Sequence, residues 1–248
     1  MTTPVQPVQT VSTRRLWLSF GGLLLGSLAL RAAAGAMGEN IQFYLNAINE
    51  AAQSPGHPLN TLLHAHVYPV SYAVGGLIIA SFFAAELLGA LVLGGLSDRY
   101  GRKPFIIFGP LFGAMAVIIT SLTTAIWLLV VTRLLEGLST AASAPATLAY
   151  IADVTEHSPK LRARLVGLFE VVTIAGVAAG FSLGGWLWRQ FGAPAIVFGV
   201  PLTSPAFAVN ALLYLLSLAI LWFGLHESRT PEHRARAAAG SLGETLAG

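Results

Sequence analysis

The amino-acid sequence predicts an all-α, polytopic membrane protein whose chain crosses the bilayer six times. Hydrophobic residues occupy 55% of its 248 positions, whereas charged residues occupy only 10%. A soluble domain carries about a quarter charged residues, so this composition favours a membrane protein. The apolar residues also gather into six long runs, each close to the ~20 residues that a helix needs to cross a bilayer. Lysine and arginine are concentrated in alternate loops, as expected for a multi-pass protein.

The six-span prediction assigns each part of the chain to a tail, a loop or a span. We expect residues 1–15 to form an N-terminal tail, residues 16–225 a six-span bundle, and residues 226–248 a second tail. The longer loops on one side are residues 39–66 and 189–205, and the other side has a charged loop at residues 153–164. The predicted spans cover about residues 16–37, 70–93, 105–123, 126–150, 165–187 and 206–224.

The loop cations predict the orientation of the bundle. On the side opposite the termini, the loops carry a single cation, Arg189. Cytoplasmic loops are the basic ones, so we expect both termini in the cytoplasm and the protein in the plasma (inner) membrane. This topology accounts for the pI near 9.5, and we expect no nucleic-acid partner. The cations on the side of the termini are Arg14, Arg15, Arg99, Arg102, Lys103, Lys160, Arg162, Arg164, Arg229, Arg234 and Arg236.

A strongly charged tight turn lies between the second and third predicted spans, at residues 94–104. It reads Gly-Gly-Leu-Ser-Asp-Arg-Tyr-Gly-Arg-Lys-Pro. This pattern resembles the loop signature of the major facilitator superfamily, which joins the second and third spans of such transporters. The resemblance implies one six-helix half of that fold, built as a 3+3 repeat; the alternative is an ordinary loop with stop-transfer charges. The matching residues are Gly94, Leu96, Asp98, Arg99, Gly101, Arg102 and Lys103.

Further motifs resemble the same family. Tyr150-Ile151-Ala152-Asp153 with the later Arg162 implies a charge network in which Asp153 pairs with Arg102 and steadies one access state. Arg133-Leu134-Leu135-Glu136-Gly137 resembles the signature that the family links to proton coupling. The glycines of the fifth span resemble the antiporter signature, but Phe181 replaces its proline, so helix packing is the favoured interpretation. These glycines are Gly176, Gly180 and Gly184.

Five charged side chains fall inside the predicted spans. A charge at mid-membrane costs ~3 kcal/mol or more, so such residues usually face water or a partner. They occur on spans one, two, four and five, which we therefore expect to surround a polar cavity, with spans three and six outside it. The residues are Arg31, Glu86, Arg133, Glu136 and Glu170.

Two interpretations of these charges remain open. Helical rise places Glu86 and Glu170 in the cytoplasmic half and Arg31 and Arg133 in the outer half. A carboxyl group buried away from a cation can hold and carry a proton, but each acid could equally be a hydrogen-bonded structural group. Likewise, Arg133 could tune a nearby carboxyl group or bind an anionic part of the cargo, or it could form a structural i,i+3 pair with Glu136.

The sequence thus favours secondary active transport of a small organic solute by alternating access with proton coupling, with drug or metabolite efflux as the preferred direction. The alternatives are a facilitated-diffusion uniporter and a non-transporting membrane subunit or scaffold. No phosphate-binding Gly-x-x-x-x-Gly-Lys-Ser/Thr loop, catalytic constellation or cysteine is present, so no enzyme activity or cofactor is expected. The histidines His57, His64 and His66 are interpreted as loop residues and not as a metal site.

The family usually has twelve spans in two six-span halves, so we expect a second half as partner. Three interpretations remain open: the sequence is a fragment, a second copy pairs with this one, or a separate chain supplies the second half.

Overall fold

The computed structural model describes residues 13–64, 66–156 and 158–225. Six of the helices formed by these residues are long and apolar enough to cross a membrane, which confirms the six-span fold class. Residues 1–12 and 226–248, which make up nearly all of the two predicted tails, lie outside the described residues. The elements are α1 (Thr13–Gln53), α2 (Pro58–Leu63), α3 (Tyr72–Tyr100), α4 (Arg102–Thr120), α5 (Ile126–Val154), α6 (Pro159–Phe191), β1 (Ala195–Val197), β2 (Val200–Leu202) and α7 (Pro205–Gly224).

The six long helices form an open arc. The most extensive packing joins α1 to α6 and α3 to α5, while α7 lies against both α1 and α4, and α4 lies against α5. The order around the arc is therefore α6, α1, α7, α4, α5, α3, and α3 and α6 are its two ends. Exchanging α1, α3 and α4 with α5, α6 and α7 preserves these contacts, as expected for a 3+3 repeat.

Glycines let α6 approach α1 closely. A Cβ atom added to Gly176 would lie 3.0 Å from the carbonyl oxygen of Leu28, and one added to Gly180 would lie 2.4 Å from that of Ala32. A Cβ atom added to Gly184 would lie 2.6 Å from the carbonyl oxygen of Ala36. The three glycines thus form the contact surface of α6 against α1, where small residues permit close backbone approach.

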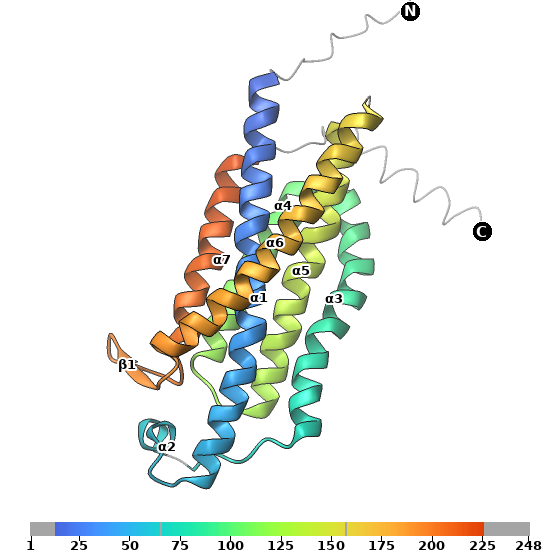
Figure 1. Cartoon of the computed structure of the whole chain (residues 1–248). Coiled ribbons are helices and arrows are strands. Elements are labelled where there is room, and N and C mark those ends of the chain that lie inside the picture. The colour runs from blue at the N-terminus through green and yellow to red at the C-terminus, as the bar shows by residue number, and fades with distance from the viewer. Residues whose placement is uncertain (1–12, 65, 157, 226–248) are drawn as a thin grey trace, which may run out of the picture.

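The first helix is longer than the sequence predicted. A loop was expected from Glu39 onward, but α1 continues to Gln53. In this extension Ile41, Tyr44 and Ile48 are buried at helical spacing, so one face of the added turns packs into the core. The extension and α2 lie at the same end of the bundle as the β1–β2 hairpin, here called the hairpin end (Figure 1).

The predicted tight loop at residues 94–104 is almost entirely helical. The third helix runs on to Tyr100 and α4 begins at Arg102, so Gly101 alone joins them. Gly101 has φ 104°, a conformation that residues with a Cβ atom rarely adopt. This turn lies at the end of the bundle where α1 begins and α7 ends, here called the terminal end (Figure 1). The charged loop expected at residues 153–164 is also mostly helical, because α5 ends at Val154 and α6 begins at Pro159.

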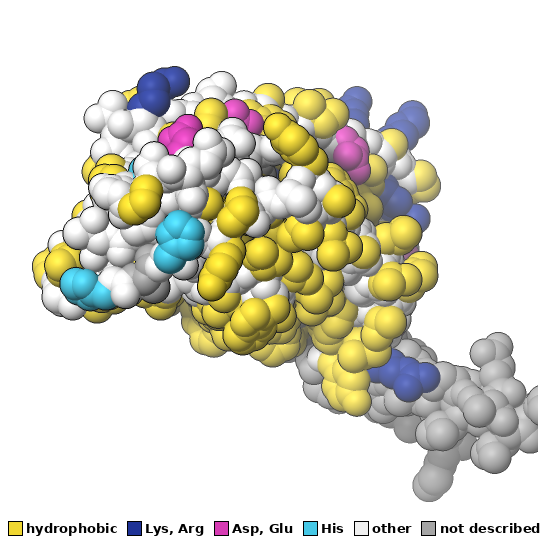
Figure 2. Space-filling view, turned by 90° about the horizontal axis from the view of Figure 1, so that it is seen from below, with side chains coloured by type: hydrophobic (Ala, Val, Ile, Leu, Met, Phe, Trp, Pro, Cys, Tyr) yellow, Lys and Arg dark blue, Asp and Glu magenta, His cyan; other side chains and the backbone are white. Residues whose placement is uncertain are grey.

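The hairpin end carries histidine side chains, and hydrophobic side chains gather along the flank of the bundle visible from it (Figure 2). His57 caps α2: its Nδ1 atom accepts a hydrogen bond of 3.2 Å from the Leu59 N–H. Within the described ranges, no group of three His, Cys, Asp or Glu side chains is placed to hold a metal ion.

Candidate functional site

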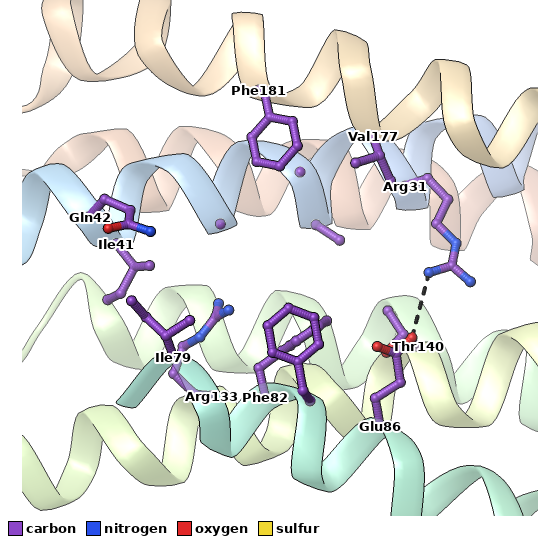
Figure 3. A pocket seen from close by; sticks show the side chains of 14 residues that line it. Arg31, Ile41, Gln42, Ile79, Phe82, Glu86, Arg133, Thr140, Val177 and Phe181 are labelled. Atoms are coloured by element: carbon purple, nitrogen blue, oxygen red, sulfur yellow. Dashed lines mark ion pairs between the residues drawn. The ribbon is translucent and has the colours of Figure 1, made fainter. Parts of the chain in front are cut away.

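A cavity of about 340 Å³ lies inside the arc, between α1, α3, α5 and α6 (Figure 3). Its wall is mostly apolar, and among the described residues that form it none belongs to α4 or α7. The volume falls in the range of small-molecule sites, which combine apolar walls with a few polar groups. The lining residues are Arg31, Ala34, Gly35, Gly38, Ile41, Gln42, Ile79, Phe82, Phe83, Glu86, Arg133, Thr140, Val177 and Phe181.

Arg31 on α1 and Glu86 on α3 face each other across one end of the cavity (Figure 3). Arg31 Nη1 lies 3.9 Å from Glu86 Oε1, so the two form an ion pair that is longer than a hydrogen bond. This corrects the sequence interpretation of Glu86 as a carboxyl group buried away from any cation. The Glu86 side chain remains 33% exposed, so water can reach it.

Arg133 presents its guanidinium group to the same cavity. The guanidinium carbon lies 4.9 Å from the centroid of the Phe82 ring, in the geometry of a cation–π contact. One Nη1 hydrogen bond goes to Glu136 Oε2, whereas the buried Nε has no hydrogen-bond partner among the described residues. The guanidinium group therefore has spare donor capacity beside the cavity.

Glu136 is fully buried and lies behind Arg133. Its second carboxylate oxygen, Oε1, accepts a hydrogen bond of 3.2 Å from the hydroxyl group of Tyr214 on α7. The expectation that Glu136 lines the cavity is thus corrected: its carboxylate points toward α7, and the i,i+3 pair with Arg133 is formed. Sequence reasoning missed Tyr214, because the charge-free sixth span gave no signal for it.

Two further predicted site residues lie outside the cavity wall. Glu170 is exposed on α6 and, within the described part of the chain, is not one of the residues around the cavity. Gly137 packs α5 against α3, since an added Cβ atom would lie 2.3 Å from the carbonyl oxygen of Phe82. Gly137 therefore helps to set the distance between Phe82 and α5, where Arg133 is located.

A second charged cluster lies at the terminal end of the bundle. The buried guanidinium group of Arg102 donates from Nε to Asp153 Oδ2 at 3.2 Å, from Nη1 to Ser97 Oγ at 2.8 Å, and from Nη2 to Asp98 Oδ1. These bonds join the start of α4 to the ends of α3 and α5. The Arg102–Asp153 pair implied by the family resemblance is present.

Neighbouring cations bind helix ends. Lys103 Nζ donates to the carbonyl oxygens of Trp222, at 3.2 Å, and Leu225, at 2.5 Å, at the end of α7. Arg162 donates from Nη2 to the Ala152 carbonyl oxygen at 3.3 Å. Arg99 is exposed. Cations near helix C-termini stabilise the last carbonyl groups.

Replacing Arg102 by glutamine is expected to loosen this cluster. The change removes a buried cation that holds Asp98 and Asp153, and the loss of such charge-assisted bonds costs about 2–3 kcal/mol. Amide hydrogen exchange in detergent should then become faster at the ends of α3 and α5. The matched control is Arg99→Gln on the exposed face of the same turn; equal exchange rates in the two variants would contradict the assignment.

The chain is similar to known proteins in sequence and in fold. A family model described as Major Facilitator Superfamily matches residues 16–245. A tetracycline resistance protein of class H from Pasteurella multocida is 32% identical over 184 residues, which cover 71% of this chain and 43% of the relative. The class C protein from Escherichia coli is 35% identical over 159 residues, covering 64% of this chain and 37% of the relative.

The crystal structure of a D-xylose-proton symporter superposes with a TM-score of 0.61 at 16% identity. The match covers 93% of this chain and 53% of the symporter, and at this identity it establishes the fold alone. The chain therefore spans less than half the length of these two curated relatives and about half of the structural neighbour.

Proposed function

Because the chain belongs to the Major Facilitator Superfamily, whose members are transporters and not enzymes, we propose that it takes part in secondary transport of a small organic solute. The solute would bind in the cavity between α1, α3, α5 and α6, which alternately opens to the two sides of the membrane. The observation that carries this proposal is a cavity of about 340 Å³ whose wall includes the charged side chains of Arg31, Glu86 and Arg133. Such charges are costly in a membrane unless they serve a pathway or a partner.

Efflux of an amphipathic drug or metabolite is the preferred direction. Support comes from the names of the two tetracycline resistance relatives and from the wall itself, in which Phe82, Phe83 and Phe181 surround a few polar groups. Aromatic walls with sparse polar contacts suit solutes with an apolar body.

We also propose that transport is coupled to protons, with Glu86 as the principal carrier. Glu86 lines the cavity and is partly exposed, and its partner Arg31 lies beyond hydrogen-bond distance. A proton could therefore reach the carboxyl group from water. Glu170 is a second candidate, because it is exposed on α6, whereas the buried Glu136 already has two donors.

A second six-helix bundle is proposed as the partner. It would cover α3 and α6, the ends of the arc, whose most apolar stretches are only 17% and 22% buried, against 56% for α4 and α5. The partner could be a second copy, a separate chain or the remainder of a longer one. We place the multi-pass bundle in the cell membrane with its terminal end in the cytoplasm, on the strength of the cations gathered there, and interpret residues 1–15 and 226–248 as tails on that side.

Flux measurements test these proposals. The full chain in proteoliposomes, with tetracycline as probe, should show flux driven by a pH gradient, and Glu86→Gln should lower this flux by about tenfold or more. The matched control is Glu50→Gln, an exposed carboxylate near the end of α1 that lies outside the cavity. Flux that ignores the pH gradient would favour facilitated diffusion, and a folded chain that transports neither this probe nor other amphipathic drugs would favour a scaffold.

A further inference from the structure

Helix α7 contributes no residue to the described part of the cavity wall. It is nevertheless linked to the wall through hydrogen bonds. Its Tyr214 hydroxyl group donates to Glu136 Oε1 at 3.2 Å, and Glu136 in turn accepts from Arg133. Tyr214 and Glu136 both have an exposed fraction of 0%. A buried chain of contacts thus runs from α7 through α5 to the guanidinium group that faces the cavity.

The position of the Tyr214 ring is fixed by α4. A Cβ atom added to Gly113 would lie 2.1 Å from Tyr214 Cε1, so the ring occupies the space that any side chain at residue 113 would need. The Tyr214 hydroxyl group is also linked to Arg133 of the cavity wall, because both donate to the Glu136 carboxylate. This tyrosine is therefore held in one place, beside the charges of the site.

We propose that Tyr214 is a positioning residue that keeps the Arg133 guanidinium group on the cavity wall. Glu136 has two carboxylate oxygens to satisfy, and at present Arg133 serves one and Tyr214 serves the other. A buried carboxylate that loses a donor seeks another. The Nε atom of the Arg133 guanidinium group has no hydrogen-bond partner among the described residues. This N–H group can therefore replace the Tyr214 hydroxyl group as the second donor to Glu136.

The consequence is that Tyr214 and Arg133 compete as donors for the Glu136 carboxylate. With the hydroxyl group present, a single Nη1 bond ties Arg133 to Glu136, and the guanidinium group lies over Phe82. Without it, a bidentate Arg133–Glu136 pair becomes favourable, and the guanidinium group turns away from Phe82. The charge offered to the cargo would then depend on α7, so this inference refines the proposed function at the same site.

Charge-selective labelling of a single cysteine tests the proposal without any cargo. The natural chain has no cysteine, so Ile79→Cys places one thiol in the cavity wall, one helical turn from Phe82. Its reaction rates with an anionic (sulfonatoethyl) and a cationic (trimethylammonioethyl) methanethiosulfonate give a ratio that reports the local potential. Tyr214→Phe, which keeps the ring, should lower the anionic-to-cationic ratio by about 5-fold, the order expected when a unit charge withdraws by a few ångströms.

Two further variants make the outcome decisive. Glu136→Gln removes the charge that compensates Arg133 and should shift the ratio in the opposite direction. In an Arg133→Gln background Tyr214→Phe should have no further effect, because the tyrosine acts through this arginine. Ser217→Ala is the control on the same helix, since its hydroxyl group bonds the carbonyl oxygen of Gly26 on α1 and not the Arg133 pair.

An unchanged ratio in Tyr214→Phe, or an equal shift in the Arg133→Gln background, would overturn the proposal. Since the labelling reads the cavity itself, a failure of solute flux would count against the proposed function and leave this result intact. Circular dichroism and gel filtration in detergent establish that each variant is folded before it is labelled; if Tyr214→Phe does not fold, an unchanged ratio in Glu136→Gln would overturn the proposal by itself.

Discussion

Replacing Glu136 by leucine is expected to destabilise the folded chain by about 3–5 kcal/mol, because it leaves a buried cation without its partner. The Arg133 side chain is only 4% exposed, and its one described hydrogen bond goes to Glu136. The stacked Phe82 ring can compensate only a small part of this loss, since a cation–π contact contributes about 1–2 kcal/mol. The variant also removes the acceptor of the Tyr214 hydroxyl group, a second buried polar group.

The double variant Arg133→Leu/Glu136→Leu should recover most of that loss, because a buried ion pair replaced as a unit leaves no unpaired charge. Unfolding in detergent, followed by far-ultraviolet circular dichroism, measures both variants. Glu50→Leu serves as the control for loss of an exposed carboxylate on α1. If Glu136→Leu has the same free energy of unfolding as Glu50→Leu, Arg133 must find another partner.

The sequence specified the spanning helices well but not their ends. Long apolar runs determine where a helix can cross a bilayer, and the six predicted runs correspond to α1 and α3–α7. The extension of α1 to Gln53 was missed because Gln42 and Asn46 alternate with buried Ile41 and Tyr44. An amphipathic extension of this kind lowers the mean hydropathy, so an argument from span length ends the helix too early.

The charged residues predicted the helices of the cavity more reliably than the contacts within it. Spans one, two, four and five do line it, as their charges indicated. The expectation that Glu86 lies away from a cation was wrong because helical rise locates Cα atoms, whereas the long side chains of Arg31 and Glu86 can meet from different levels. Glu136 turned toward α7 because Tyr214 offers a donor there, and a hydroxyl group on an otherwise apolar span has no charge signature.

Most of the cavity wall could not be predicted, because its residues are as apolar as those that face lipid. Phe82 lines the cavity, while Leu87 on the same helix is 68% exposed on the bundle surface. Hydropathy treats the two positions alike. Which side chains face inward depends on how the helices pack, for example α3 against α5 where Gly137 meets the Phe82 carbonyl oxygen.

Replacing Gly180 by leucine is expected to separate α1 from α6 and to cost ~3 kcal/mol or more, at the upper end for overpacked positions. The added Cβ atom would lie 2.4 Å from the Ala32 carbonyl oxygen, 2.9 Å from the Ala36 nitrogen and 2.9 Å from the Gly35 Cα atom. All three are backbone atoms of α1, so no side-chain rotation can relieve the clash and the helices must move apart. Because Arg31 and Val177 lie at this contact, the cavity should change shape as well.

The matched control is Gly185→Leu on the same helix. There the nearest atom to an added Cβ is the Arg189 Nη1 atom at 4.0 Å, and leucine has the higher helix propensity, so this variant should be as stable as the natural chain or slightly more so. Unfolding in detergent measures both, and the efficiency of disulfide cross-linking between cysteines introduced at Leu28 and Val177 measures the separation of α1 from α6. If Gly180→Leu cross-links and unfolds as Gly185→Leu does, the close approach of the two helices is not what holds this side of the arc together, and α7 must position α1 instead.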